Sequence, residues 1–332
     1  IDELIIGQVL PAGSGQAMPR QVSLGAGIPP HVGGMQLSKV CGSSLKAVML
    51  AAGLIRAGDG DVYVAAGTES MTNAPFLNLE GRAGHKYGHF ELKDAIIWDG
   101  LYDHVEDWIM GEAAEFIARE MGITREELDE FACRSHRLAH EATEAGRFAA
   151  EIVPVEIPGR KGQVTVFDRD ESIRPDTTLE TLAKLRPAFL PDGMVTAGNS
   201  PGLNDGAAAL VVASREYAER HGHQPLARIV GYGQAAVEPK WIFYAPVKAM
   251  PKALERAGWT MDDVDLVELN EAFAAQVLAD IKGLAQDGYD LPLEKLNVNG
   301  GGIAIGHPIG ASGARVLVTL IHALKQRGLK RG

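Results

Sequence analysis

Short apolar runs alternate with helix-period stretches along most of this chain. Met35, Leu37 and Val40 predict a short buried strand, and the apolar spacing that follows predicts a helix ended by Gly58. Further strands are predicted at 1–9, 61–70, 206–214, 226–235, 264–271 and 296–299, and further helices at 20–27, 215–221, 246–257 and 311–326. Strands and helices of these lengths indicate βαβ units and a mostly parallel sheet covered on both faces. The chain is therefore predicted to be of the α/β class.

The pattern changes in the middle of the chain, where loops and scattered aromatic residues replace the short strands. Helices are predicted here at 110–121 and 125–146. Thr124 is the expected N-cap of the second helix, and Glu127 is its expected capping-box partner. We interpret residues 72–203 as an excursion inserted into the sheet domain.

The two ends of the chain resemble each other. The stretches 1–8 and 264–271 are both Asp-bearing strands, and each is followed by a strand, a turn of small residues and an apolar helix. This repetition indicates a duplicated α/β half. Two such halves would place Cys41 and the glycine-rich loop 300–313 at matching strand ends, where open α/β sheets bind ligands.

Composition narrows the class of protein. The 332 residues suffice for about two domains. A net charge of −11 argues against a nucleic-acid partner. The two cysteines exclude a disulfide scaffold, and no apolar run is expected to reach the ~18 residues of a membrane span. The chain starts at Ile1 and stops just after a basic helix, so we expect that both ends are cut; the expected location is cytoplasmic.

Cys41 stands at the join between a predicted strand and a predicted helix, just before Gly42, Ser43 and Ser44. The free N–H groups and the dipole of a helix N-terminus favour a thiolate, which is the reactive form of cysteine. A covalent acyl carrier could be built at this position. The alternative is an inert cysteine packed as a small hydrophobe.

Two further residues could work with Cys41. His307 lies in GGGIAIGHPIGASGA, where it can act as a base or as an oxyanion donor; the alternative is a loop histidine bonded to a backbone carbonyl. Asn270, in LNEAFAAQ, either has a functional role or caps the next helix. The histidines in polar stretches lack a metal-ligand pattern, and no metal site is predicted. Cysteine, histidine and asparagine together fit a cysteine hydrolase or an acyl-transferring enzyme with a covalent thioester.

Five motifs together resemble the thiolase family, and within it the branch that condenses acetyl-CoA: KVCGSSLKAV, KLRPAF, GNSPGLNDGAAA, NEAFAAQ and NGGGIAIGHPIGASGAR. The resemblance covers essentially the whole chain. It implies two similar halves of α-β-α-β-α layers with an inserted loop domain. The halves would be 1–71 with 204–225, and 226–332 with its last strand missing; the loop domain 72–203 would bind coenzyme A.

The resemblance also implies a mechanism and a place in fatty acid metabolism. Cys41 would take an acyl group from a first acyl-CoA as a thioester. A second acetyl-CoA would bind with its thioester oxygen held by His307 and by a water on Asn270. Its enolate would attack the acyl-Cys41 in a Claisen condensation that gives acetoacetyl-CoA; the reverse is thiolysis. Coenzyme A and acetyl-CoA would be substrates, and no cofactor would be permanently bound.

The family pattern assigns residues to the coenzyme as well. It places Arg174 and Thr181 near the nucleotide, Phe189, Ala197 and Leu203 along the pantetheine, and Met110, Ala272 and Phe273 near the acyl end. Phosphates need cations in an acidic protein, and a basic cluster offers them, although its simpler interpretation is a solvated surface. The cluster consists of Arg160, Lys161, Arg174, Lys184 and Arg186.

The sequence departs from the family pattern in ways that bear on activity. The family's second catalytic cysteine, in a Cys-x-Gly-Gly-Gly strand, is not among these residues, and Cys133 lies on a helix of the insertion. A polypeptide of these 332 residues is therefore expected to be inactive or impaired. Substrate preference stays open at the departures Ser38, Ser44, Ile109 and Pro201.

Three alternatives remain open at this point. A 3-ketoacyl-CoA thiolase would act on longer chains, and a thiolase-fold protein could bind acyl-CoA without turning it over. A cysteine protease is disfavoured because it has no need for the 72–203 segment. Thiolases are dimers or tetramers, so the resemblance implies a homodimer or homotetramer.

Overall fold

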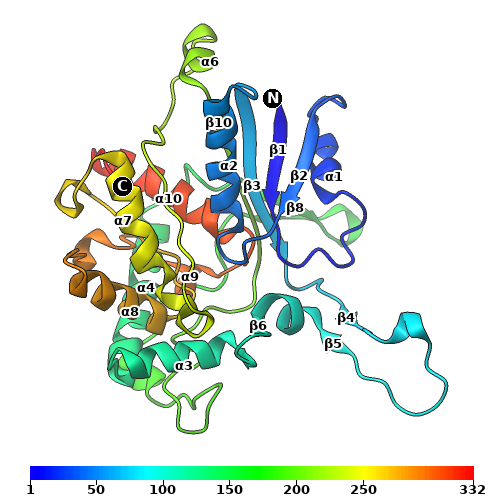
Figure 1. The fold of residues 1–332 in the computed structure, drawn as a ribbon, viewed down its shortest axis with the longest axis vertical. Coiled ribbons are helices and arrows are strands. Elements are labelled where there is room, and N and C mark those ends of the chain that lie inside the picture. The colour runs from blue at the N-terminus through cyan, green and yellow to red at the C-terminus, as the bar shows by residue number, and fades with distance from the viewer.

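The fold is built around a four-stranded sheet with the order β10-β3-β1-β2. A computed structural model describes residues 1–332, except for the side chain of Lys161. β1 (Glu3–Gly7) pairs in parallel with β2 (Gly33–Leu37) on one side and with β3 (Val62–Ser70) on the other. β10 (Asp205–Ala213) closes the sheet antiparallel to β3 (Figure 1). The predicted α/β class and mostly parallel sheet are confirmed.

Helices cover both faces of this sheet, and the alternation along β1 shows why. Ile5 packs into a cluster with α2 (Ser43–Ala57), whereas Leu4 and Ile6 pack into another with α1 (Met18–Gly25). Successive side chains of a strand point to opposite faces, so a continuous apolar run such as LII needs a cover on each side. α10 (Ser312–Arg327) packs against α2 and β10 and adds to the first cover.

α2 is a core helix in spite of its composition. Residues Val40–Ala57 have a mean hydropathy of 1.4 over 18 residues, enough by length and composition to cross a membrane. This corrects the expectation that no apolar run reaches that length. Ala47, Val48 and Ala51 are buried against the sheet, so the apolar face of α2 packs on the strands. Gly58 ends the helix as predicted, in the left-handed conformation at φ 79°.

β2 differs from the prediction of a buried strand. It is one of the two outer strands of the sheet, and its side chains are half-buried or exposed. Val40 lies beyond its end, at φ 47°, with 42% of its surface exposed. A short apolar run does not reveal whether its strand is central or at an edge, which is why the sequence misled here.

Residues 72–203 contain two long helices, one short helix and several small hairpins. The capping box at Thr124 is confirmed, because its side chain accepts from the Glu127 amide and the Glu127 carboxylate accepts from the Thr124 amide. An arm built on the first hairpin projects from the body of the molecule (Figure 1). The elements are β4 (Phe76–Leu77) with β5 (Lys93–Asp94), β6 (Tyr102–Asp103) with β7 (Trp108–Ile109), α3 (Met110–Glu120), α4 (Arg125–Glu144), β8 (Val155–Pro158) with β9 (Val164–Phe167), and α5 (Leu179–Leu182).

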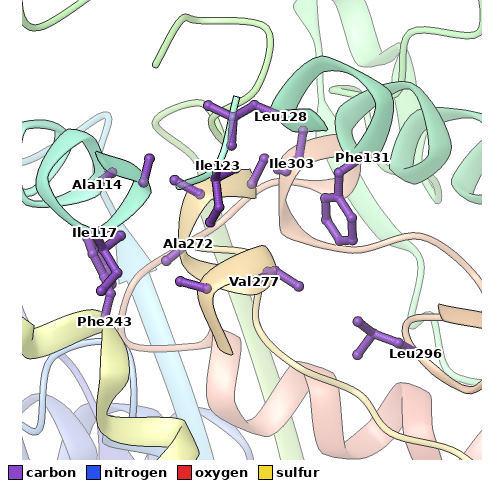
Figure 2. Close-up of a cluster of buried hydrophobic side chains, with 14 of the residues drawn as sticks. Ala114, Ile117, Ile123, Leu128, Phe131, Phe243, Ala272, Val277, Leu296 and Ile303 are labelled. Atoms are coloured by element: carbon purple, nitrogen blue, oxygen red, sulfur yellow. The ribbon is translucent and has the colours of Figure 1, made fainter. Parts of the chain in front are cut away.

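The largest apolar core joins the middle of the chain to its C-terminal part. α3 and α4 pack against α8 (Ala274–Gln286), and α4 also packs against α9 (Gly302–Ile305). In Figure 2, Ile117, Leu128 and Phe131 lie in the same cluster as Val277 and Ile303. The helices of 72–203 therefore share one core with the C-terminal part. The division at 72, 204 and 226 itself stays a prediction.

The strands predicted at 226–235, 264–271 and 296–299 do not form a ladder in this structure. Val267 makes one bridge with Leu296, and Val298 makes one with Gly300. The segment 226–235 instead lies against α7 (Ala245–Ala257). The approach is close, because a Cβ added to Gly231 would lie 2.9 Å from the Ala253 carbonyl oxygen. The prediction of strands at these three places was wrong. A strand needs a neighbour to pair with, and local apolar content does not reveal one. The other short helices are α6 (Arg215–Arg220) and the 3-10 turns at 81–83, 160–162, 239–244, 261–263 and 293–295, with a π-helix at 96–101.

We predict that Gly67→Ala lowers the free energy of unfolding by about 1–3 kcal/mol, as overpacking does in a close-packed core. A Cβ there would overlap the Gly310 carbonyl oxygen and the Ser44 side chain. The matched control is Gly53→Ala in α2, where a Cβ has room because its nearest neighbour is the Tyr232 hydroxyl at 3.7 Å. The control should stabilise by up to about 1 kcal/mol, because alanine is the better helix former. Urea unfolding measures both, and equal effects would contradict the packing described here.

Candidate active site

Cys41 and His307 meet beside the end of the sheet, although 266 positions separate them in the chain. The Cys41 Sγ lies 3.2 Å from His307 Nε2, a hydrogen-bonding distance for sulfur. Cys41 is half-buried, and His307 is 7% exposed. Sequence analysis placed both residues at strand ends, and the structure brings them together.

A tight turn presents the sulfur. The Gly42 amide donates to the Lys39 carbonyl at 3.0 Å, and the Ser43 amide donates to the Val40 carbonyl at 3.0 Å. The Ser43 hydroxyl accepts from the Lys39 amide at 2.8 Å and donates to the Val40 carbonyl at 2.6 Å. These bonds hold β-branched Val40 in the left-handed region, an uncommon conformation that surrounding structure must stabilise. Cys41 is thereby fixed at the start of α2.

Glu69 ties the His307 loop to the sheet. Its carboxylate accepts from the amides of Val9 and Leu10, at 2.9 and 3.0 Å, and from the Gly310 amide at 2.9 Å. The residue is 2% exposed, and burial raises the pKa of its carboxyl group. One side chain of β3 thus fixes two loops that are distant in sequence.

Ser312 sets the tautomer of His307. The Ser312 hydroxyl donates its only proton to the Pro308 carbonyl at 3.0 Å. His307 Nδ1, 2.6 Å from that hydroxyl, must therefore be the donor to it. His307 Nε2 is then the unprotonated nitrogen, and this is the atom that faces the thiol.

Burial keeps both members of the pair neutral. It lowers the pKa of His307 to about 4. It raises the pKa of the Cys41 thiol to about 12, and the nearby Glu69 charge adds to this rise. The prediction of a resting thiolate is therefore wrong, because desolvation outweighs the helix N-terminus. The geometry instead places an S–H next to a neutral imidazole that can accept its proton.

Asn270 completes the cluster. Its Nδ2 lies 3.4 Å from His307 Nε2. α8 begins at Ala274 with Phe273 as its N-cap, so the alternative that Asn270 caps this helix is wrong. Two hydrogen bonds join the preceding residue, Leu269, to Asn297. The Leu269 amide donates to Asn297 Oδ1 at 2.8 Å, and Asn297 Nδ2 donates to the Leu269 carbonyl at 2.9 Å.

The residue after Asn270 is anchored as well. Glu271 is fully buried, and its carboxylate accepts from the Ser135 hydroxyl at 2.6 Å, from Asn297 Nδ2 at 2.9 Å and from the Ile303 amide at 3.1 Å. Burial raises the pKa of Glu271, and its hydrogen bonds oppose that rise. Fixed neighbours on both sides leave Asn270 little freedom to move.

The helices that begin at the site are also joined to each other. The Ala314 amide, in the first turn of α10, donates to the Ser44 hydroxyl at 2.8 Å, in the first turn of α2. Ser44 is one of the departures from the family pattern, and here it has a clear structural role. A Cβ on Gly313 would lie 2.6 Å from the Leu45 amide nitrogen, so the contact requires glycine there.

Four of the residues expected near the acyl end and the pantetheine belong to one apolar cluster: Met110, Phe189, Ala272 and Phe273. The Phe189 ring covers Gly111, the residue after Met110, and meets Phe273 edge-on with ring centroids 6.2 Å apart. Phe273 also meets Phe243, at 5.5 Å. Ala272 is buried in the core on which these side chains pack.

The other expected coenzyme contacts are exposed. The Arg174 side chain is exposed, and its amide donates to His136 Nδ1 at 3.1 Å. Thr181 is exposed, but its hydroxyl donates to the Thr178 carbonyl at 2.8 Å as part of the cap of α5. Ala197 is exposed, and Leu203 is 62% exposed. Lys161 of the predicted basic cluster lies outside the described side chains. The other four cations of the cluster are exposed: Arg160, Arg174, Lys184 and Arg186.

Sequence reasoning missed the residues that hold the cluster in place. Ser312, Glu69, Glu271 and Asn204 all contact the catalytic loops through hydrogen bonds. All except Glu69 lie within the quoted motifs, where polar residues among glycines were the available signal. Among the described residues no group of three or more His, Cys, Asp or Glu is placed to hold a metal ion.

A cysteine paired with a neutral histidine and an asparagine, at the end of a covered α/β sheet, defines a class: enzymes with a covalent cysteine intermediate. Residues 1–216 match the family described as Thiolase, N-terminal domain, and residues 223–332 match Thiolase, C-terminal domain. The chain belongs to the thiolase family, as the motifs predicted.

Named relatives are similar over the whole chain. An acetyl-CoA acetyltransferase of Allochromatium vinosum is 51% identical over 333 residues, covering 100% of this chain and 83% of the relative. One from Cupriavidus necator is 52% identical with the same coverage. The solved structure of a Syntrophomonas wolfei acetyl-CoA acetyltransferase has a TM-score of 0.97 at 41% identity, covering 99% of this chain and 82% of that one. The structure of a Bacillus anthracis acetyl-CoA acetyltransferase has a TM-score of 0.94 at 46% identity, with the same coverage. These likenesses confirm the predicted thiolase fold.

We predict that iodoacetamide alkylates Cys41 slowly at pH 7, with a rate that rises about tenfold per pH unit to above pH 10, because only the thiolate reacts. The raised pKa of Cys41, about 12, places its titration beyond that range. The variant Cys133→Ser removes the other thiol, and intact mass reports the extent of reaction. A plateau between pH 6 and 9 would contradict this account, since it would indicate a resting thiolate.

Proposed function

We propose that this chain is an acyl-CoA acyltransferase that condenses two acetyl-CoA to acetoacetyl-CoA, or runs the reverse thiolysis. The observation that carries the proposal is the 3.2 Å contact between the Cys41 thiol and the unprotonated Nε2 of His307. The names of the relatives support the choice of acetyl-CoA as substrate.

In the first half-reaction, His307 Nε2 takes the thiol proton as Cys41 Sγ attacks the thioester carbonyl carbon of acetyl-CoA. The C–S bond to coenzyme A breaks, and coenzyme A leaves as a thiolate. The products are acetyl-Cys41 and a His307 ring that now carries a proton on Nε2. The neutral resting pair makes this step possible at neutral pH, because the base is already deprotonated.

In the second half-reaction, the protonated Nε2 and the Asn270 side chain hold the thioester oxygen of a second acetyl-CoA. Such donors are needed, because the α-proton is too weakly acidic without stabilisation of the enolate oxygen. The enolate attacks the acetyl-Cys41 carbon, a C–C bond forms, and the thiolate of Cys41 recovers its proton from His307. The α-proton ends on the coenzyme A thiolate released earlier. The family pattern assigns the relay of this proton to a second cysteine, which is not among these 332 residues.

Coenzyme A would bind along the surface of 72–203. The exposed cations Arg174, Lys184 and Arg186 are the proposed partners of its phosphates, because charge-assisted bonds to phosphate are strong. Phe189 and Phe273 would border the acyl end, and the contact of Phe273 with Phe243 supports a short acyl group over a long one.

We also propose a homodimer or homotetramer in the cytoplasm with a role in fatty acid metabolism. The outer position of β2 supports an oligomer, because an exposed sheet edge invites pairing with another chain. Val40, just beyond the end of β2, is 42% exposed. Sedimentation of the purified chain measures the oligomeric state, and a monomer at micromolar concentration would reject that part.

We predict that acetyl-CoA adds one acetyl group to the wild-type chain and none to Cys41→Ala, because the sulfur of Cys41 is the only proposed acceptor. Intact mass followed by peptide mapping measures the addition. Turnover is measured with acetoacetyl-CoA plus coenzyme A on a version extended by the Cys-x-Gly-Gly-Gly strand. Turnover that survives Cys41→Ala would reject the mechanism; binding of acetyl-CoA without acetylation would favour the binding-only alternative. Faster turnover of longer 3-ketoacyl-CoA would favour the long-chain alternative.

His307→Ala and Asn270→Ala should separate the two half-reactions. Loss of His307 removes the base of the first step, so acetylation should slow by about 10²–10⁴-fold. Asn270→Ala should leave acetylation within about threefold and slow the carbon–carbon step by about 10²–10³-fold, as for a lost oxyanion donor. Rapid-quench mass measurements and acetoacetyl-CoA absorbance give the two rates. Equal loss in both steps for Asn270→Ala would contradict the assigned role.

A further inference from the structure

Asn204 connects the catalytic histidine to the loop that carries Arg174. Its Oδ1 accepts from the His307 amide at 3.0 Å, and its Nδ2 donates to the Ser172 hydroxyl at 3.0 Å. The orientation of this amide is determined, because the His307 N–H is a donor and must face the oxygen. Both ends of one side chain are therefore used, one on the catalytic loop and one on the loop 168–178.

Asn204 has little room to move. It immediately precedes β10, where Asp205 pairs with Ser70 of β3. Its side chain packs on Gly306, and a Cβ on that glycine would lie 2.7 Å from the Asn204 Cγ. Gly306 has φ 95°, a conformation that also favours glycine. A displacement of the Asn204 amide would therefore move the backbone of His307.

The loop 168–178 is fixed on both sides of Ser172. Asp170 makes a two-pronged ion pair with Arg315 of α10, with both N–O distances 2.6 Å. The Arg174 amide donates to His136 on α4 at 3.1 Å. Ser172 therefore lies between two anchored residues of this loop, and its hydroxyl is the contact with Asn204. A shift of Arg174 would reach Asn204 through Ser172.

We propose that Asn204 is a positioning residue that couples the seating of the coenzyme's nucleotide at loop 168–178 to the placement of His307 against Cys41. This inference rests on the proposed function, in which Arg174 lies by the nucleotide. Ser312 fixes the ring through Nδ1, and Asn204 fixes the backbone, so together they determine where Nε2 lies. Binding energy from a remote part of the substrate would then serve the acylation step.

The test is the maximal rate of Cys41 acetylation with two thioesters. Acetyl-CoA carries the nucleotide, and S-acetyl-N-acetylcysteamine lacks it. Asn204→Leu should slow acetylation by about 10–100-fold with both thioesters, because an error of about 1 Å at a reacting group has effects of that size. Ser172→Ala should slow acetyl-CoA by about 3–10-fold and leave the short thioester unchanged, since only the link to the nucleotide is cut.

Ser172→Thr is the matched control, because it keeps the hydroxyl and should keep wild-type rates. Thermal unfolding of each variant separates a fold defect from a positioning defect. The proposal is overturned if Asn204→Leu keeps its maximal rate within twofold. It is also overturned if Ser172→Ala changes only the half-saturating concentration of acetyl-CoA, which would make Ser172 a binding contact.

A second readout needs no thioester, so failure of the proposed function can be told apart from failure of this inference. The second readout is the nitrogen NMR spectrum of the chain labelled with ¹⁵N-histidine. The signals of the His307 ring are those lost in His307→Ala, and they should be those of one neutral Nδ1–H tautomer. In Asn204→Leu the two nitrogen shifts should move toward those of a mobile, averaged ring. Unchanged shifts would overturn the positioning role, whether or not acetyl-CoA reacts with Cys41.

Discussion

The close approach of two helix N-termini is the constraint on which the site depends. α2 begins beside Cys41 and α10 begins beside the His307 loop, and the Ser44 hydroxyl bonds the first turn of one to that of the other. Glycine is required around this contact, because a Cβ on Gly67 or Gly313 would overlap atoms of the facing segment. Close-packed interiors transmit small displacements, so the distance between sulfur and imidazole is set by this packing.

The same packing determines the electrostatics of the pair. Excluding water from the sulfur and the ring disfavours the charged form of each, and both rest neutral. A neutral imidazole is a competent base, and Ser312 directs its lone pair toward the thiol. The reactive thiolate then forms only as a substrate carbonyl is attacked, which protects Cys41 from adventitious alkylation. The buried carboxylates Glu69 and Glu271 hold the backbone of the site through hydrogen bonds, and the Glu69 charge also adds to the raised pKa of the Cys41 thiol.

Much of this arrangement could be predicted from the sequence. The small residues after Cys41 and the glycine-rich stretch around His307 marked the two segments that meet at the site, and the motif resemblance identified the family. The thiolate was predicted wrongly, because the helix dipole can be inferred from sequence whereas burial of the sulfur cannot. The strand at 226–235 was predicted wrongly for a similar reason: pairing depends on a neighbour, and local apolar content does not reveal one. The supporting contacts of Asn204 and Glu69 join residues far apart in the chain, which periodicity cannot detect.

A neutral Cys41 thiol hydrogen-bonded to His307 is tested most directly by its S–H stretching band. The band is observed in the Raman difference spectrum between the wild-type chain and Cys41→Ser at neutral pH. We expect a band displaced by the hydrogen bond to His307, which moves to the position of a free thiol in His307→Ala. No S–H band at neutral pH, or a band that His307→Ala leaves unchanged, would contradict it.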